Sequence, residues 1–151
     1  MTLFPPTLEE ARARIATVNP AEYSRSRNAL NGAVTQLSPY ITHGFISLPE
    51  VLEGVRLHHS VRTQDKFVFE LGWREYFRHV WQHRGNGIFK SLHEGVLSDE
   101  AYADRIPFDI LHASTGVAAI DMAVKTLYAT GYLHNHARMW LASYMVHLRK
   151  V

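Results

Sequence analysis

The stretch TQDKFVFELGWREYFRHVWQH, residues 63–83, restricts the fold most, because its apolar side chains recur at helical spacing throughout. No segment of the chain shows the convincing every-second-residue alternation that is typical of a half-buried β-strand. Apolar residues make up 46% of the sequence, which is enough for a globular core. The pattern therefore predicts an all-α fold.

Helix-start signals support this prediction. Thr7 with Glu10, and Ser47 with Glu50, have the spacing of capping boxes, in which two side chains satisfy free backbone N–H groups reciprocally. Ser38 followed by a proline is a third expected N-cap. Residues 21–32, AEYSRSRNALNG, are expected to be irregular because they are polar, and residues 88–113 are expected to be rich in loops.

The remaining helix boundaries follow from the same rules. We expect an end of the first helix at Asn19-Pro20, a long helix from Thr63 to a stop at Gly85, a helix from Ser114 or Thr115 to Gly131, and a last helix from about Asn135 onward.

Composition narrows the classes of function. The chain contains no cysteine, which excludes disulfides and thiolate metal sites. His79 and His83 have the spacing of two metal ligands on one helix face, but no third ligand has convincing spacing, so no metal site is predicted. The formal net charge is +2, which permits a polyanionic partner without requiring one. We expect a cytoplasmic protein without a signal peptide or membrane span.

Hydroxyl and basic residues gather ahead of the helix expected at Ser38. Thr35 lies just before it, and Arg25 and Arg27 lie upstream. Hydroxyls and free N–H groups at a helix start, with guanidinium groups nearby, suit a phosphate. Simple helix capping explains the same residues, and both interpretations remain open here.

A second candidate site lies on the long helix. Phe67, Glu70 and Arg74 share one face, and Trp73 flanks it. One interpretation is an intrahelical Glu70–Arg74 pair at the surface. The other is the wall of a ligand pocket, in which Glu70 meets a polar heterocycle, the aromatic side chains stack and Arg74 meets phosphate.

A third candidate lies in TGYLHNHARMW, residues 130–140. Asn135 and Arg138 are three residues apart and share a helix face. The asparagine amide offers a donor and an acceptor to a heterocycle, and Arg138 offers a charge to phosphate. Alternatively, Asn135 is an N-cap and Arg138 an ordinary surface residue.

Four blocks occur together in one order: YSRSRN at 23–28, TQLSPY at 35–40, ELGWREYFRH at 70–79, and TG, ID and TGYLHNHARM within 115–139. With them the chain resembles the helical FAD-binding domain of the DNA photolyase/cryptochrome family. The resemblance covers most of the chain but only the first part of that domain. It implies a single, apparently incomplete, FAD-binding domain over residues 1–151.

The resemblance also implies roles for individual residues. Three positions match residues that face damaged bases, and they are the expected catalytic residues: Glu70, Trp73 and Met139. Two basic positions are expected to bind DNA: Arg27 and Arg78. The positions expected to hold FAD are Tyr23, Thr35, Leu37, Ser38, Phe67, Arg74, Asn135 and Arg138.

The implied activity is that of a deoxyribodipyrimidine photolyase, a carbon–carbon lyase that splits pyrimidine dimers in damaged DNA by light-driven electron transfer from reduced flavin. A cryptochrome-like blue-light receptor with the same flavin site and no repair activity is the first alternative. A helical scaffold that binds a protein or nucleic acid, but no flavin, is the second.

Overall fold

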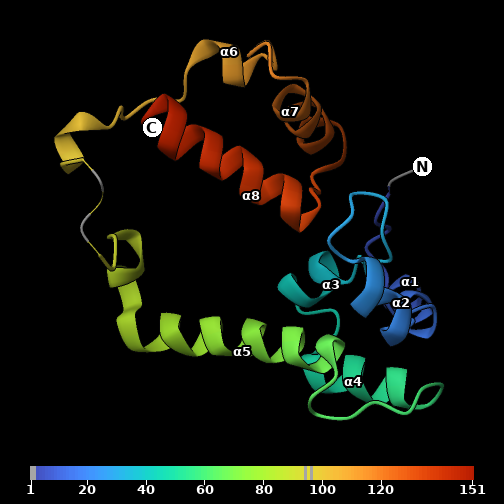
Figure 1. Ribbon diagram of the computed structural model, residues 1–151. Helices are drawn as coiled ribbons and strands as arrows, with labels where there is room; N and C mark the ends of the chain where they lie inside the picture. Colours follow the sequence, from blue (N-terminus) through green and yellow to red (C-terminus); the bar gives the residue numbers. More distant parts are fainter. Residues whose placement is uncertain (1–2, 94, 96) are drawn as a thin grey trace. The chain divides into compact units, whose positions relative to one another are not determined.

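The protein is described by a computed structural model that covers residues 3–93, 95 and 97–151 (Figure 1). The structure is 61% helical and its described residues include no strand, which confirms the all-α prediction. The elements, in chain order, are α1 (Leu8–Ala16), α2 (Pro20–Ser26), α3 (Ser38–Thr42), α4 (Leu48–Arg56), α5 (Lys66–Arg84), the 3₁₀ turns η1 (Gly85–Phe89) and η2 (Asp99–Ala101), α6 (Phe108–Leu111), α7 (Ala118–Thr130), α8 (Asn135–Ser143) and the π-helical η3 (Tyr144–Arg149).

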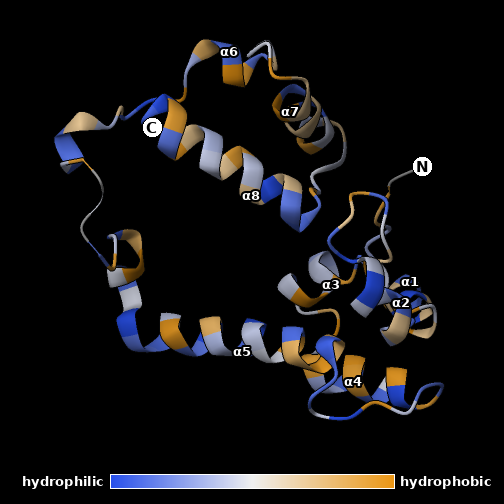
Figure 2. Cartoon of the chain, viewed as in Figure 1, coloured by the Kyte–Doolittle hydropathy of each residue, from blue (hydrophilic) through white to orange (hydrophobic). Residues whose placement is uncertain are grey.

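The chain divides into two compact units, Met1–Asn86 and Gly87–Val151. In the first unit α1 packs against α4 and α2 packs against α5. One core lies in this unit, and hydrophobic residues of α4, coloured orange in Figure 2, contribute to it. Its buried members are Ala11, Ile15, Val18, Leu37, Tyr40, Ile46, Val51, Val55 and Phe67.

The second unit is built on α6, α7, α8 and η3, which pack in sequence along the chain. Its buried residues form two small clusters, around Val124 and around Leu133, and Leu141 packs against both. Gly131 ends α7 in the left-handed conformation, with φ of 67°, as the sequence predicts.

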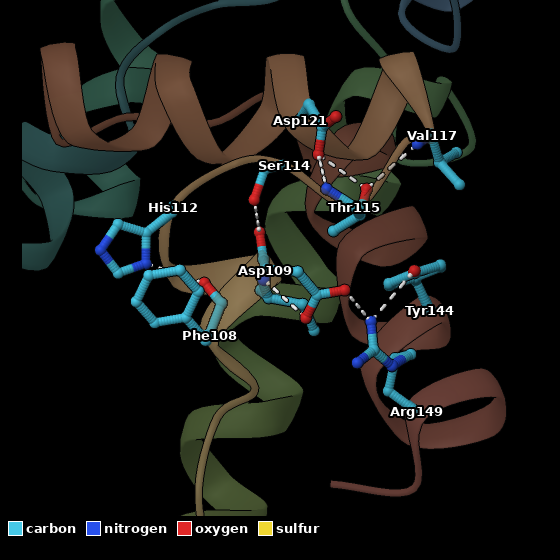
Figure 3. A network of polar contacts seen from close by, with 10 residues as sticks. Phe108, Asp109, His112, Ser114, Thr115, Val117, Asp121, Tyr144 and Arg149 are labelled. Carbon is cyan, nitrogen blue, oxygen red and sulfur yellow. Dashed lines mark hydrogen bonds and ion pairs between the residues drawn. The ribbon is translucent and has the colours of Figure 1, made fainter.

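Polar contacts reinforce this second unit (Figure 3). The Arg149 guanidinium of η3 pairs with the Asp109 carboxylate of α6 and donates to the Tyr144 hydroxyl. The Asp121 carboxylate of α7 accepts hydrogen bonds from the backbone N–H and the hydroxyl of Thr115, at 2.8 and 2.6 Å. Both carboxylates therefore have lowered pKa values: the main cause is the Arg149 hydrogen bond for Asp109 and the Thr115 hydroxyl for Asp121.

The lowered pKa of Asp109 predicts a pH effect. Because its pKa is lower in the folded than in the unfolded chain, Asp109 stabilises the second unit above its unfolded pKa, and this contribution is lost as pH falls through the folded pKa. Asp109→Asn is therefore expected to reduce the loss of stability from about pH 5 downward, as followed by thermal unfolding. If stability fell with pH equally steeply in the parent and in Asp109→Asn, this prediction would be contradicted. Asp104→Asn, which changes an exposed carboxylate, is the control.

Several predicted helix boundaries are confirmed. The Thr7 hydroxyl accepts the Glu10 N–H at 3.2 Å, and Ser47 and Glu50 form a complete capping box. The long helix ends at Arg84, just before Gly85, and α8 begins at Asn135.

Other boundaries were wrong. Residues 21–26 were expected to be irregular, but Pro20–Ser26 form α2. The Asn19 side chain accepts the N–H groups of Ala21 and Glu22, both at 3.1 Å, and Asn19-Pro20 therefore starts a helix. Leu37 rather than Ser38 precedes α3 as its cap residue. The long helix starts at Lys66 after Asp65, and α7 starts at Ala118, because the Thr115 hydroxyl is engaged by Asp121.

Candidate functional site

An aromatic pair joins α2 to α5 in the first unit. The rings of Tyr23 and Phe67 meet edge to face, with centroids 5.7 Å apart. Phe67 is only 2% exposed and belongs to the core, whereas Tyr23 is partly buried and packs against it. These two predicted cofactor residues therefore pack together as one aromatic wall.

Charged groups lie beside this wall. The Glu70 carboxylate is 3.7 Å from Nε of Arg27 and 2.9 Å from Nζ of Lys66, and the Arg27 guanidinium lies 6.0 Å from the Tyr23 ring centroid. Glu70, predicted to be catalytic, is thus held by two cations. Sequence reasoning identified Arg27 but missed Lys66, although its spacing, four residues before Glu70, is a usable signal.

The segment before α3 carries the predicted hydroxyls. The Thr35 hydroxyl accepts the Leu37 N–H at 3.3 Å, and Leu37 itself is 1% exposed in the core. Ser38 is the first residue of α3, and no side-chain hydrogen bond caps that helix among the described residues. A cavity of about 70 Å³ lies between this segment and α2, lined in part by Tyr23 and Thr35.

Arg74 and Arg78 face a larger groove bounded by α3, α4 and α5, of about 670 Å³. Arg74 Nη2 donates to the Thr42 hydroxyl of α3 at 2.6 Å, a partner that the sequence did not indicate. Trp73, also predicted to be catalytic, is 43% exposed and stacks on Phe77 with ring centroids 5.9 Å apart.

The remaining predicted residues share the first turns of α8 in the second unit. The Asn135 amide donates to Met139 Sδ at 3.6 Å, and Arg138 Nη2 donates to the Leu133 carbonyl at 3.4 Å. All three side chains are exposed. The alternative role of Asn135 as N-cap was wrong, because the His134 ring accepts the His136 N–H there at 3.1 Å.

Each unit thus presents part of the predicted set. In the first, hydroxyls, guanidinium groups and an aromatic wall offer contacts to phosphate and to a planar ring. In the second, an amide and a guanidinium share one exposed helix face. Within the described residues, no group of three or more potential metal ligands comes together, and no helix has the length and apolarity needed to cross a membrane.

Comparison with known proteins identifies the family of this chain. The family model described as the FAD binding domain of DNA photolyase matches residues 67–149. The chain is 32% identical over 135 residues to a cryptochrome DASH of Ostreococcus tauri, covering 83% of this chain and 24% of the relative. It is 31% identical over 135 residues to cryptochrome DASH of Danio rerio, covering 83% and 25%.

A tomato relative, the chloroplastic/mitochondrial cryptochrome DASH of Solanum lycopersicum, is 30% identical over 131 residues, or 82% of this chain and 23% of its own length. The chain therefore spans about a quarter of the length of the curated relatives it matches. The family match covers more than half of this chain and includes both α5 and α8, which carry many of the predicted residues. The chain belongs to the family of DNA photolyase FAD-binding domains, whose cofactor is FAD.

Proposed function

We propose that this chain is the flavin-binding part of a photolyase that repairs pyrimidine dimers in DNA under light, within a single domain spanning residues 1–151. The observation that supports it most is the cluster of Tyr23, Arg27, Phe67 and Glu70, which places an aromatic wall, a carboxylate and a cation side by side. A cytoplasmic location remains a prediction.

The residues present fit the cofactor. The start of α3 lacks a side-chain cap among the described residues, so its amide and hydroxyl groups suit an acceptor such as the FAD diphosphate. The cavity of about 70 Å³ that Thr35 and Tyr23 help to line, and that no residue of α3 lines, has room for a few waters or one group of phosphate size. Thr35 and Ser38 would hold the diphosphate, with Tyr23 and Phe67 forming the wall beside it. Leu37, being buried, would support the site through the hydrogen bond that its N–H donates to Thr35.

When bound and reduced, FAD supplies a photoexcited electron to the substrate. This chain's residues would do the positioning. Glu70 would hydrogen-bond the dimer after it leaves the DNA stack, and the two cations beside it hold this carboxylate in place. Arg78 and Arg27 would hold DNA phosphates, Trp73 and Met139 would contact the dimer, and Arg74, Asn135 and Arg138 would hold the cofactor.

A second candidate is a blue-light receptor that binds FAD without repairing DNA. It is favoured by the names of the relatives from Solanum lycopersicum, Ostreococcus tauri and Danio rerio, each of which is called a cryptochrome DASH.

One experiment separates these functions. The full 151-residue chain is titrated with FAD, and flavin bound after gel filtration is measured by absorbance. The loaded protein is then reduced and illuminated with blue light in the presence of an oligonucleotide that contains one thymine dimer. Bound flavin and dimer loss support repair, whereas bound flavin with intact dimers favours the receptor. A chain that binds no FAD leaves only the helical scaffold.

Glu70→Gln is expected to preserve FAD binding and to slow dimer repair by about tenfold, because one charged hydrogen bond to the substrate is weakened. The measurement is the rate of dimer loss under constant illumination. Glu75→Gln on the same helix, at an exposed position, serves as the matched control. Equal rates for Glu70→Gln and the parent would rule out this role of Glu70.

A further inference from the structure

Gln36 adopts a left-handed backbone conformation, with φ of 53°, between Thr35 and Leu37. This conformation is unfavourable for residues other than glycine because the Cβ atom crowds the backbone. It occurs within the segment that carries the predicted phosphate-binding hydroxyls. Such a conformation persists where surrounding contacts stabilise it.

Arg14 of α1 provides that contact. Its Nη1 donates to the Gln36 side-chain oxygen at 2.7 Å, its Nη2 to the Leu3 carbonyl at 2.8 Å, and its Nε to the Glu10 carboxylate at 2.9 Å. The Arg14 side chain is 17% exposed. All three donor nitrogens of the guanidinium are thus engaged, which fixes its orientation toward Gln36.

Aromatic rings restrict the same guanidinium. Its carbon lies 4.8 Å from the ring centroid of Phe4 and 5.7 Å from that of Tyr40, on α3. The Tyr40 hydroxyl in turn donates to the Pro5 carbonyl at 3.1 Å. Arg14 therefore connects α1 to the segment at residues 3–5, to Gln36 just before α3, and to Tyr40 within α3.

We propose that Arg14 is a positioning residue for the cofactor diphosphate: it holds Gln36 left-handed and thereby fixes the path of the backbone between Thr35 and Ser38. This inference rests on the proposed function, because it assumes that FAD binds at the start of α3. Arg14 touches neither Thr35 nor Ser38 by any hydrogen bond found among the described residues, so it acts through Gln36.

Three variants test the Arg14–Gln36 contact. Arg14→Met keeps a long apolar side chain against Phe4 and Tyr40 but loses the hydrogen bonds. Gln36→Leu removes only the acceptor and leaves the other Arg14 contacts intact, so it remains informative if Arg14→Met fails to fold. Gln36→Gly also removes the acceptor, but glycine adopts positive φ without support. Arg12→Met, at an exposed position of the same helix, is the matched control.

Two measurements are made on each variant: the FAD dissociation constant, and the backbone chemical shifts and N–H to Hα coupling of residue 36 in the cofactor-free chain. In Arg14→Met and Gln36→Leu we expect residue 36 to leave the left-handed region and the dissociation constant to rise about tenfold. Gln36→Gly, alone or combined with Arg14→Met, is expected to bind FAD nearly as well as the parent, as is Arg12→Met.

The inference is overturned if residue 36 stays left-handed in Arg14→Met or Gln36→Leu, or if Gln36→Gly loses as much FAD affinity as Gln36→Leu. A parent chain that binds no FAD would refute the proposed function instead. In that case the spectra still decide on the contact: relaxation of residue 36 in Gln36→Leu supports it, and an unchanged conformation overturns it.

Discussion

Replacing Phe67 with alanine is expected to lower the free energy of unfolding by about 3–5 kcal/mol, the usual cost of truncating a buried phenylalanine. Phe67 is 2% exposed and is among the largest fully buried side chains of the described residues. Its loss leaves a cavity between α2 and α5, and Tyr23 loses the ring that it contacts edge to face. Urea-induced unfolding measured by circular dichroism gives the change directly.

Phe69→Ala is the matched control for this substitution. Phe69 lies on the same helix and is 50% exposed, so its truncation removes far less buried surface and is expected to cost less than about 1.5 kcal/mol. If both variants lost the same stability, the assignment of Phe67 to the core of the first unit would be refuted. A variant of Phe67 that folds is also expected to bind FAD more weakly, because the Tyr23 wall becomes mobile.

Gly32→Ala is expected to destabilise the first unit by about 1–3 kcal/mol, the usual cost of overpacking. A Cβ atom at position 32 would lie 1.8 Å from the Ser26 carbonyl oxygen and 3.0 Å from that of Ala29. Both neighbours are backbone atoms, and each already accepts a backbone hydrogen bond in this turn, so neither moves away cheaply. The turn leads directly into residues 33–38, and FAD affinity is therefore expected to fall too.

The same substitution at Gly72 provides a control of opposite sign. Gly72 lies within α5, and no atom is within 4 Å of the position that a Cβ would occupy. Alanine there is expected to stabilise the helix by about 0.5–1 kcal/mol, because glycine has the higher conformational entropy when unfolded. Thermal unfolding of both variants tests the pair. A Gly32→Ala protein as stable as the parent would show that the tight turn is not required.

Local sequence determined the all-α fold and several helix ends. Ser47 and Glu50 cap α4, and Gly131 ends α7, because these features depend on side chains within a few residues of the backbone groups that they satisfy. The ordered blocks of residues likewise indicated the family that the comparisons show. The roles of the individual site residues remain predictions.

The tertiary structure decided which partners these residues have. Glu70 pairs with Arg27 at the C-terminal end of α2, and Arg74 donates to Thr42. Gln36 accepts a hydrogen bond from Arg14. In each pair the two residues are far apart in the sequence. The π-helical geometry of Tyr144–Arg149, where the sequence predicts a continuous α-helix, accompanies the pairing of Arg149 with Asp109. Such contacts have no local signature: they depend on how whole helices pack, and helix packing is set by the shape of the core rather than by neighbouring residues in the chain.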